Sequence, residues 1–108
     1  MCQRTRRRAV SFGALSTSVP GSVAGLAQMH AAHGARPWAS LFAGAVEAAR
    51  DGFAATHAYR HFARENRHRL RPDAASAATF LGAGGEAPDL GALVVQPDLA
   101  RTLETLAR

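Results

Sequence analysis

The strongest apolar pattern in the chain predicts a helix over residues 37–51. Apolar residues recur there at the i, i+3, i+4 spacing that places side chains on one helical face; they are Trp38, Leu41, Phe42, Ala45, Val46 and Ala49. Pro37 suits the first helical position, Gly52 is expected to end the helix, and Phe53 is expected to fold back on its last turn. We expect Trp38, Leu41, Phe42 and Val46 to face the core, and Trp38→Ala to cost roughly 3–5 kcal/mol if that site is buried.

Weaker patterns and capping residues predict further helices on both sides of this segment. A turn at Pro20-Gly21 opens a helix over 21–33, which Gly34 is expected to end in left-handed geometry. Gly25 inside this helix indicates close packing against another backbone. Thr56 caps a helix over 56–70 that Pro72 stops, and Asp73 caps a shorter one over 74–81. Pro97-Asp98 begins a last helix, with leucines on one face at 99, 103 and 106. This helix has no ending signal before Arg108, which suggests that more chain should follow.

The remaining segments look irregular. Residues 1–12 show neither helical nor strand periodicity and are expected to form a disordered or unrelated lead. The glycine-rich stretch 82–88 predicts a loop, and Val94-Val95 form a short apolar pair. Isoleucine is absent and aromatic residues are few, which favours helix over sheet. The sequence therefore predicts a mainly α fold of several short helices.

The formal net charge of +5 is local, and all basic charge is arginine. One cluster lies at Arg4–Arg8, and a second lies within 60–71, on a helix whose histidines and arginines lie opposite a thin apolar stripe at Ala58, Tyr59, Phe62 and Asn66. We expect this basic face to be solvated. A small arginine-rich helical module that binds nucleic acid or an acidic partner remains the alternative. Single-strand binding would require aromatic residues on the basic face for stacking, but here they lie on the other side.

Candidate chemistry in the sequence is sparse. His57 and His61 share a helical face and Glu65 lies one turn on, but arginines crowd that face, so no metal site is assigned. The glycines of 82–85 follow a helix, whereas a phosphate-binding loop follows a strand, so a turn is favoured. Cys2 is the only cysteine, which excludes an internal disulfide, and its place near the terminus makes it a poor nucleophile. The serines at 11, 16, 18 and 22 lie in no G-x-S-x-G setting.

Targeting signals are equally sparse. No apolar stretch approaches the roughly 20 residues of a membrane span. Polar residues and glycine interrupt Ala9–Val19, so no signal peptide is predicted and the localisation is not assigned.

Several segments, in order, resemble the gamma-glutamyltransferase family (glutathione hydrolases). Ser18–Leu26 resembles its V-P-G-x-V-x-G-L motif, and Gly34–Trp38 resembles G-x-x-P-W. Leu41–Ala45 is similar to L-x-x-P-A, with Gly44 in place of the proline, and Ala48–Phe53 is similar to A-x-x-G-F. Further matches lie at Phe80–Gly82, which with the glycines that follow it resembles the F-L-x-x-G loop, and at Val95–Leu103, which resembles Q-P-x-L-A-x-T-L.

The resemblance implies that residues 13–108 are a helical part of the large subunit of an Ntn-hydrolase (αββα) fold. The family transfers or hydrolyses the γ-glutamyl group of glutathione-like substrates, and its members are often periplasmic or secreted. The family's nucleophile is an N-terminal threonine of a small subunit; Thr56, Thr79, Thr102 and Thr105 do not match it. Its substrate-binding arginine lies in an R-E-x-A-P segment, which Arg4–Arg8 do not match.

We therefore assign no catalytic, cofactor-binding or metal residue. The resemblance implies that the chain is scaffold and is inactive alone. Its partners would be the remainder of the large subunit and the small subunit.

Overall fold

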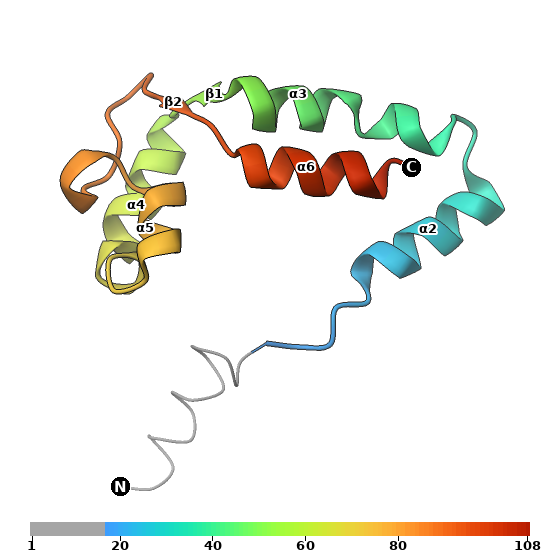
Figure 1. Ribbon diagram of the computed structural model, residues 1–108, viewed down its shortest axis with the longest axis horizontal. Coiled ribbons are helices and arrows are strands. Elements are labelled where there is room, and N and C mark those ends of the chain that lie inside the picture. Colours follow the sequence, from blue (N-terminus) through green and yellow to red (C-terminus); the bar gives the residue numbers. More distant parts are fainter. Residues whose placement is uncertain (1–16) are drawn as a thin grey trace, which may run out of the picture. The chain divides into compact units, whose positions relative to one another are not determined.

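The computed structural model describes residues 17–108, and the chain divides into two compact units at 1–35 and 36–108. The described part of the first unit holds one helix, α2 (Ser22–His33). The second unit holds the remaining described elements, which are mainly helices joined by short turns and one very small sheet (Figure 1). The mainly α prediction is confirmed, and the predicted lead at 1–12 lies outside the described residues.

Helix α2 lies where the sequence predicts it, but its two glycines behave differently from expectation. Gly34 follows the helix with φ −69° and ψ 129°, so the predicted left-handed cap is wrong. A Cβ at Gly34 would lie 2.5 Å from the ring and the carbonyl oxygen of His30, and this close approach explains the glycine. A Cβ at Gly25 would have no described atom within 4 Å, so close packing there is not observed.

The second unit is a nested hairpin of helices and strands. Helix α3 (Ala43–Asp51), strand β1 (Phe53–Ala54) and helix α4 (His57–Leu70) run outward. Helix α5 (Ala74–Phe80), strand β2 (Leu93–Val94) and helix α6 (Pro97–Leu106) return. Helix α6 packs along α3, β2 pairs with β1 in antiparallel register, and α5 packs on α4 (Figure 1). Phe53 lies opposite Val94, so it belongs to the sheet and does not fold back on the preceding helix as expected.

The predicted helix over 37–51 is interrupted. A 3₁₀ helix, η2 (Trp38–Leu41), precedes α3, and Pro37 flanks η2 with an extended ψ of 133°. The indole Nε1 of Trp38 donates to the carbonyl oxygen of Leu106 at 2.7 Å and so satisfies the C-terminal end of α6. Arg50 pairs with Glu104 farther along the same two helices. Trp38 thus anchors the return helix through its indole nitrogen, while its ring meets Phe42 edge-on at 4.9 Å.

Both predicted side-chain caps are present. The hydroxyl of Thr56 accepts from the Tyr59 N–H at 3.2 Å at the start of α4. The carboxylate of Asp73 accepts from the Ser76 N–H at 2.7 Å at the start of α5. Hydrogen bonds from Ser76, first from its side chain and then from its backbone, lower the pKa of the Asp73 carboxyl. These caps fix where each helix of the outer pair begins.

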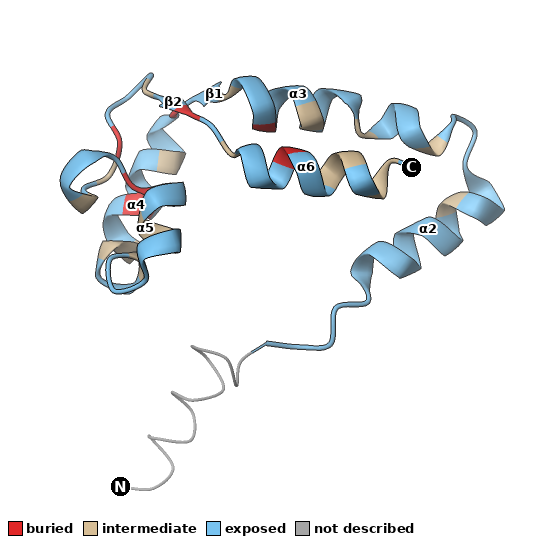
Figure 2. Ribbon diagram, viewed as in Figure 1, coloured by how far each residue is buried: buried red, intermediate tan, exposed pale blue. Residues whose placement is uncertain are grey.

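The core of the described residues is small and built largely from alanine. The buried apolar residues are Ala49, Ala55, Ala63, Leu81, Val94 and Ala100 (Figure 2). Of the predicted apolar stripe, Trp38, Phe42 and Val46 are half-buried, whereas Leu41 is 49% exposed, so its predicted core position is wrong. On α4 the predicted Phe62 is also exposed, and the adjacent Ala63 is buried instead. Alanine lets helices approach closely but buries little area, so large apolar side chains remain at the surface.

Candidate functional site

Arginines of α4, together with Arg71 directly after it, pair with acidic residues of the glycine-rich loop that follows α5. The Glu86 carboxylate pairs with Arg67 and lies 3.8 Å from a guanidinium nitrogen of Arg71. Asp89 lies 3.7 Å from Arg60. These three side chains remain 42–52% exposed, as predicted for a solvated basic face, but their pairing with the loop was not predicted. One sequence signal could have found the pairing, because Glu86 and Asp89 are the only acidic residues between Asp73 and Asp98.

Glycine allows this loop to follow its path beside α4. Gly84, Gly85 and Gly91 have φ of +75°, +72° and +77°, a region that favours glycine. A Cβ at Gly85 would lie 3.0 Å from Nε of Arg71, and Arg71 donates to the Gly84 carbonyl oxygen at 3.3 Å. The glycines therefore shape a single arginine-bound 3₁₀ turn, η3 (Ala83–Gly85), where the sequence predicts a turn.

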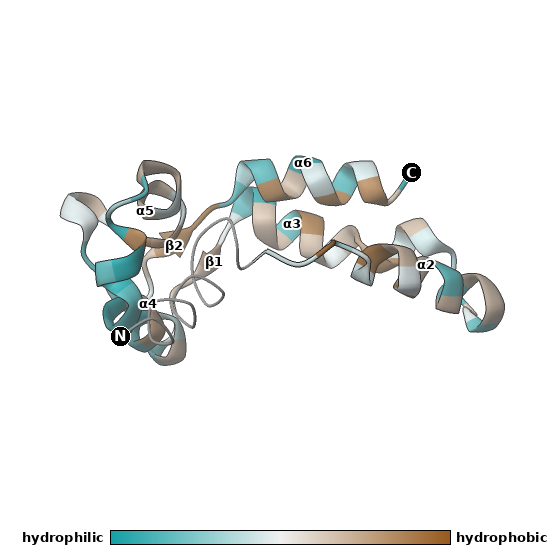
Figure 3. Cartoon of the chain, turned by 90° about the horizontal axis from the view of Figure 1, so that it is seen from below, coloured by the Kyte–Doolittle hydropathy of each residue, from teal (hydrophilic) through white to brown (hydrophobic). Residues whose placement is uncertain are grey.

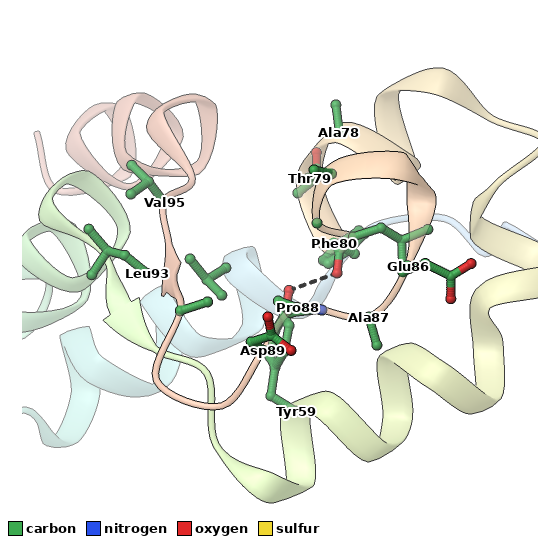
Figure 4. A pocket seen from close by; sticks show the side chains of 15 residues that line it. Tyr59, Ala78, Thr79, Phe80, Glu86, Ala87, Pro88, Asp89, Leu93 and Val95 are labelled. Atoms are coloured by element: carbon green, nitrogen blue, oxygen red, sulfur yellow. Dashed lines mark hydrogen bonds between the residues drawn. The ribbon is translucent and has the colours of Figure 1, made fainter.

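A pocket of about 570 Å³ lies between the end of α5, this loop and β2 (Figure 4). Within it, the phenol of Tyr59 donates to the Phe80 carbonyl oxygen at 3.3 Å, and its ring meets Phe53 edge-on at 5.8 Å. Burial raises the pKa of the Tyr59 phenol, which favours the protonated form that donates this hydrogen bond. The Thr79 hydroxyl in the same wall donates to the Ala75 carbonyl oxygen at 2.8 Å. The polar groups here therefore hold the backbone in place.

The hydroxyls of the other three candidate threonines are likewise engaged with helical backbone. Thr56 caps α4, as described above. The hydroxyl of Thr102 donates to the Asp98 carbonyl oxygen at 3.0 Å, and that of Thr105 donates to the Arg101 carbonyl oxygen at 2.9 Å. A hydroxyl used in this way lies on a helix surface beside its own turn. These contacts give Thr56, Thr79, Thr102 and Thr105 structural roles.

The remaining candidates are not gathered into one site. His57 and His61 are exposed on α4, and the His61 ring meets Phe62 edge-on at 5.5 Å. Within residues 17–108, no three His, Cys, Asp or Glu residues are placed to hold a metal ion. None of the helices in the described part of the chain is long and apolar enough to cross a membrane. Ser18 and Ser22 are exposed, whereas Cys2, Arg4–Arg8, Ser11 and Ser16 lie outside the described residues.

Comparison with known proteins gives one consistent family. The gamma-glutamyltranspeptidase family model matches residues 1–108. "Glutathione hydrolase 7" of Rattus norvegicus is 39% identical over 94 residues, which cover 85% of this chain and 14% of that protein. "Glutathione hydrolase 3" of Arabidopsis thaliana is 33% identical over 99 residues, covering 92% of this chain and 15% of that protein. The chain thus spans about one seventh of the length of these curated relatives.

Solved structures agree with the sequence comparison. The gamma-glutamyltranspeptidase of Helicobacter pylori matches with a TM-score of 0.87 and 30% identity, covering 93% of this chain and 29% of that one. The Bacillus anthracis transpeptidase CapD matches with a TM-score of 0.74 and 29% identity, covering 83% of this chain and 30% of that one. The helices described above therefore recur as one helical part of a larger fold.

Proposed function

Because the chain belongs to the gamma-glutamyltranspeptidase family, we propose that residues 13–108 form a scaffold segment of an enzyme that transfers or hydrolyses γ-glutamyl groups. The substrates of the complete enzyme would be glutathione-like. Its nucleophile would be a threonine outside these 108 residues, with its own α-amine as base and a γ-glutamyl-enzyme as intermediate. The partners of the segment would be the remainder of the large subunit and the small subunit.

One observation carries this proposal: the similarity to the Helicobacter pylori enzyme extends over 93% of the chain at a TM-score of 0.87. Catalysis of acyl transfer requires a nucleophile with its base, a charge clamp for the substrate and an oxyanion site. In residues 17–108 the four candidate threonines serve helix caps and helix surfaces instead. These roles support scaffold over catalysis.

Ion pairs within the second unit count against the alternative of an arginine-rich binding module. Arg60, Arg67 and Arg71 are engaged with the loop of the same unit. Binding to phosphates would have to break these pairs, which adds a cost to any nucleic-acid contact. We expect only weak, salt-dependent nucleic-acid binding, with dissociation constants of about 10⁻⁴–10⁻⁶ M near 0.15 M salt.

A chimeric enzyme tests the proposal. Residues 17–108 would replace the matching segment of the Helicobacter pylori gamma-glutamyltranspeptidase, and the same enzyme with that segment deleted would serve as control. We expect the chimera to release chromophore from a γ-glutamyl anilide and the deletion variant to be inactive. A soluble, folded chimera without turnover would contradict the scaffold role, as would nanomolar, sequence-selective nucleic-acid binding by the chain.

A further inference from the structure

The backbone of the loop between α5 and β2 is fastened to the rest of its unit near one end. In residues 82–92, which we call the strap, the Gly82 N–H donates to the Glu86 carbonyl oxygen at 2.8 Å, so the first half closes on itself. At the far end, the Gly91 N–H donates to the Ala55 carbonyl oxygen at 2.9 Å, and the Ala55 N–H donates to the residue after Gly91 at 2.8 Å. Among the described residues, Ala55 is the one backbone partner that the strap has outside itself.

Between its ends the strap is held on α4 by charged side chains. Glu86 pairs with Arg67 and Arg71, and Asp89 pairs with Arg60. Figure 3 shows the hydrophilic colouring along α4 that these arginines contribute to. All five side chains are at least 42% exposed. Pairs between exposed side chains are individually weak and are screened by salt, so this attachment depends on ionic strength.

Burial of apolar surface adds little to hold the strap. Pro88 is the one buried residue in 82–92. A Cβ at Gly82 would lie 3.5 Å from Cα of Pro88, so this proline lies against the first residue of the strap itself. By contrast, Val94 in β2 and Ala100 in α6 are buried in the rest of the unit. Segments with few buried apolar contacts open at a lower free energy than the elements around them.

The strap also forms one wall of the pocket of about 570 Å³. Glu86, Ala87, Pro88 and Asp89 all line that pocket (Figure 4). We propose that the strap opens as a unit, leaving α4 and this pocket while the helices and the β1–β2 pair stay folded. Ionic strength sets how often it opens, because salt weakens the ion pairs that hold it. The inference does not depend on the γ-glutamyl chemistry proposed above.

A glutamate-specific protease reports opening of the strap in the full 108-residue chain. Glu86 lies in the strap, whereas the other three glutamates of the chain, Glu47, Glu65 and Glu104, lie in helices α3, α4 and α6. When opening and closing are fast relative to cleavage, the rate at Glu86 follows the population of the open strap. A synthetic peptide of residues 82–92 measures the activity of the protease itself at each salt concentration.

Arg67→Gln and Arg64→Gln are the matched variants for this experiment. Both remove one positive charge from α4, but Arg67 pairs with Glu86, whereas Arg64 is exposed and has no ion pair among residues 17–108. After correction with the peptide, we expect cleavage at Glu86 to rise about threefold or more between about 0.02 and 0.5 M sodium chloride. At the lower salt, Arg67→Gln should raise it about twofold or more, and Arg64→Gln should leave it unchanged.

The pattern of cleavage decides the proposal. Cleavage confined to Glu86, with the expected response to salt and to Arg67→Gln and with unchanged helical circular dichroism, would support an opening strap. A rate at Glu86 that is independent of salt, or that changes equally in both variants, would overturn it. Cleavage of the helical glutamates at the same rate as Glu86 would also overturn it, because the whole unit would then be unfolding. Each result leaves the scaffold role to be judged separately by the chimera.

Discussion

Gly52 forms the turn from α3 into β1 in a backbone conformation that favours glycine. We therefore expect Gly52→Ala to destabilise the second unit strongly. Its φ of +89° and ψ of 166° lie in a region open essentially to glycine only, and placing another residue there costs about 1–3 kcal/mol. A Cβ would also lie 2.8 Å from Cγ of Leu93 and from Cγ2 of Val95. Because valine is stiff about χ1, relief requires a shift of β2, and such overpacking costs about 1–3 kcal/mol more. We expect Gly52→Ala to lower the free energy of unfolding by about 2–6 kcal/mol.

Gly44 provides the matched control for this substitution. It lies in the preceding helix, and a Cβ there would have no described atom within 4 Å. Gly44→Ala should therefore raise stability by about 0.5–1 kcal/mol, the ordinary gain of alanine over glycine in a helix.

Urea denaturation of the chain measures both effects, with fluorescence of Trp38, the only tryptophan, as the probe. For a slope of about 1–2 kcal/mol/M, the midpoint for Gly52→Ala should fall by at least about 1 M. Equal shifts in both variants, or an unchanged midpoint for Gly52→Ala, would refute the reasoning.

Three further predictions concern the contacts that hold the second unit. Trp38→Phe removes the donor to Leu106 and should cost about 0.5–1.5 kcal/mol, read from the thermal midpoint by circular dichroism; an unchanged midpoint would contradict this role. The lowered pKa of Asp73 means that its stabilising effect is present above its unfolded pKa of about 3.9 and is lost as pH falls through the folded pKa. Asp73→Ala should therefore lower the thermal midpoint at pH 7 but not at pH 2, and an equal loss at both would contradict this account. Arg67→Gln breaks the pair with Glu86 and should speed loop amide exchange, with a cost of about 0.2–1 kcal/mol that shrinks in high salt; no change at low salt would contradict the contact.

Local interactions made much of the second unit predictable from sequence. Thr56 and Asp73 cap helices because a side-chain oxygen two or three residues before a backbone N–H is a local signal. Pro97 likewise marks the start of α6. The family resemblance rests on capping residues, prolines and glycines of this kind. It predicted the fold class that the match to a solved structure supports.

Contacts between distant residues were not predictable in the same way. The pairing of Arg67 with Glu86 joins residues 19 apart and depends on how α5 folds back on α4. The exposure of Leu41 and Phe62 has a different cause. Helical periodicity predicts which residues share a helical face, but it does not predict whether another element covers that face. Where alanines such as Ala63 make the close helix contact, a neighbouring large residue remains outside. The β1–β2 pair was missed because two residues are too few to show alternation.

The central claim, that this chain is scaffold and lacks a catalytic site of its own, is tested most directly by the activity of the purified 108-residue chain. The measurement is release of chromophore from a γ-glutamyl anilide, compared with a Thr56→Ala, Thr79→Ala, Thr102→Ala, Thr105→Ala variant and with buffer. The account predicts the same rate in all three samples, because these hydroxyls bond to helical backbone. Turnover well above the buffer rate that is lost in the variant would contradict it.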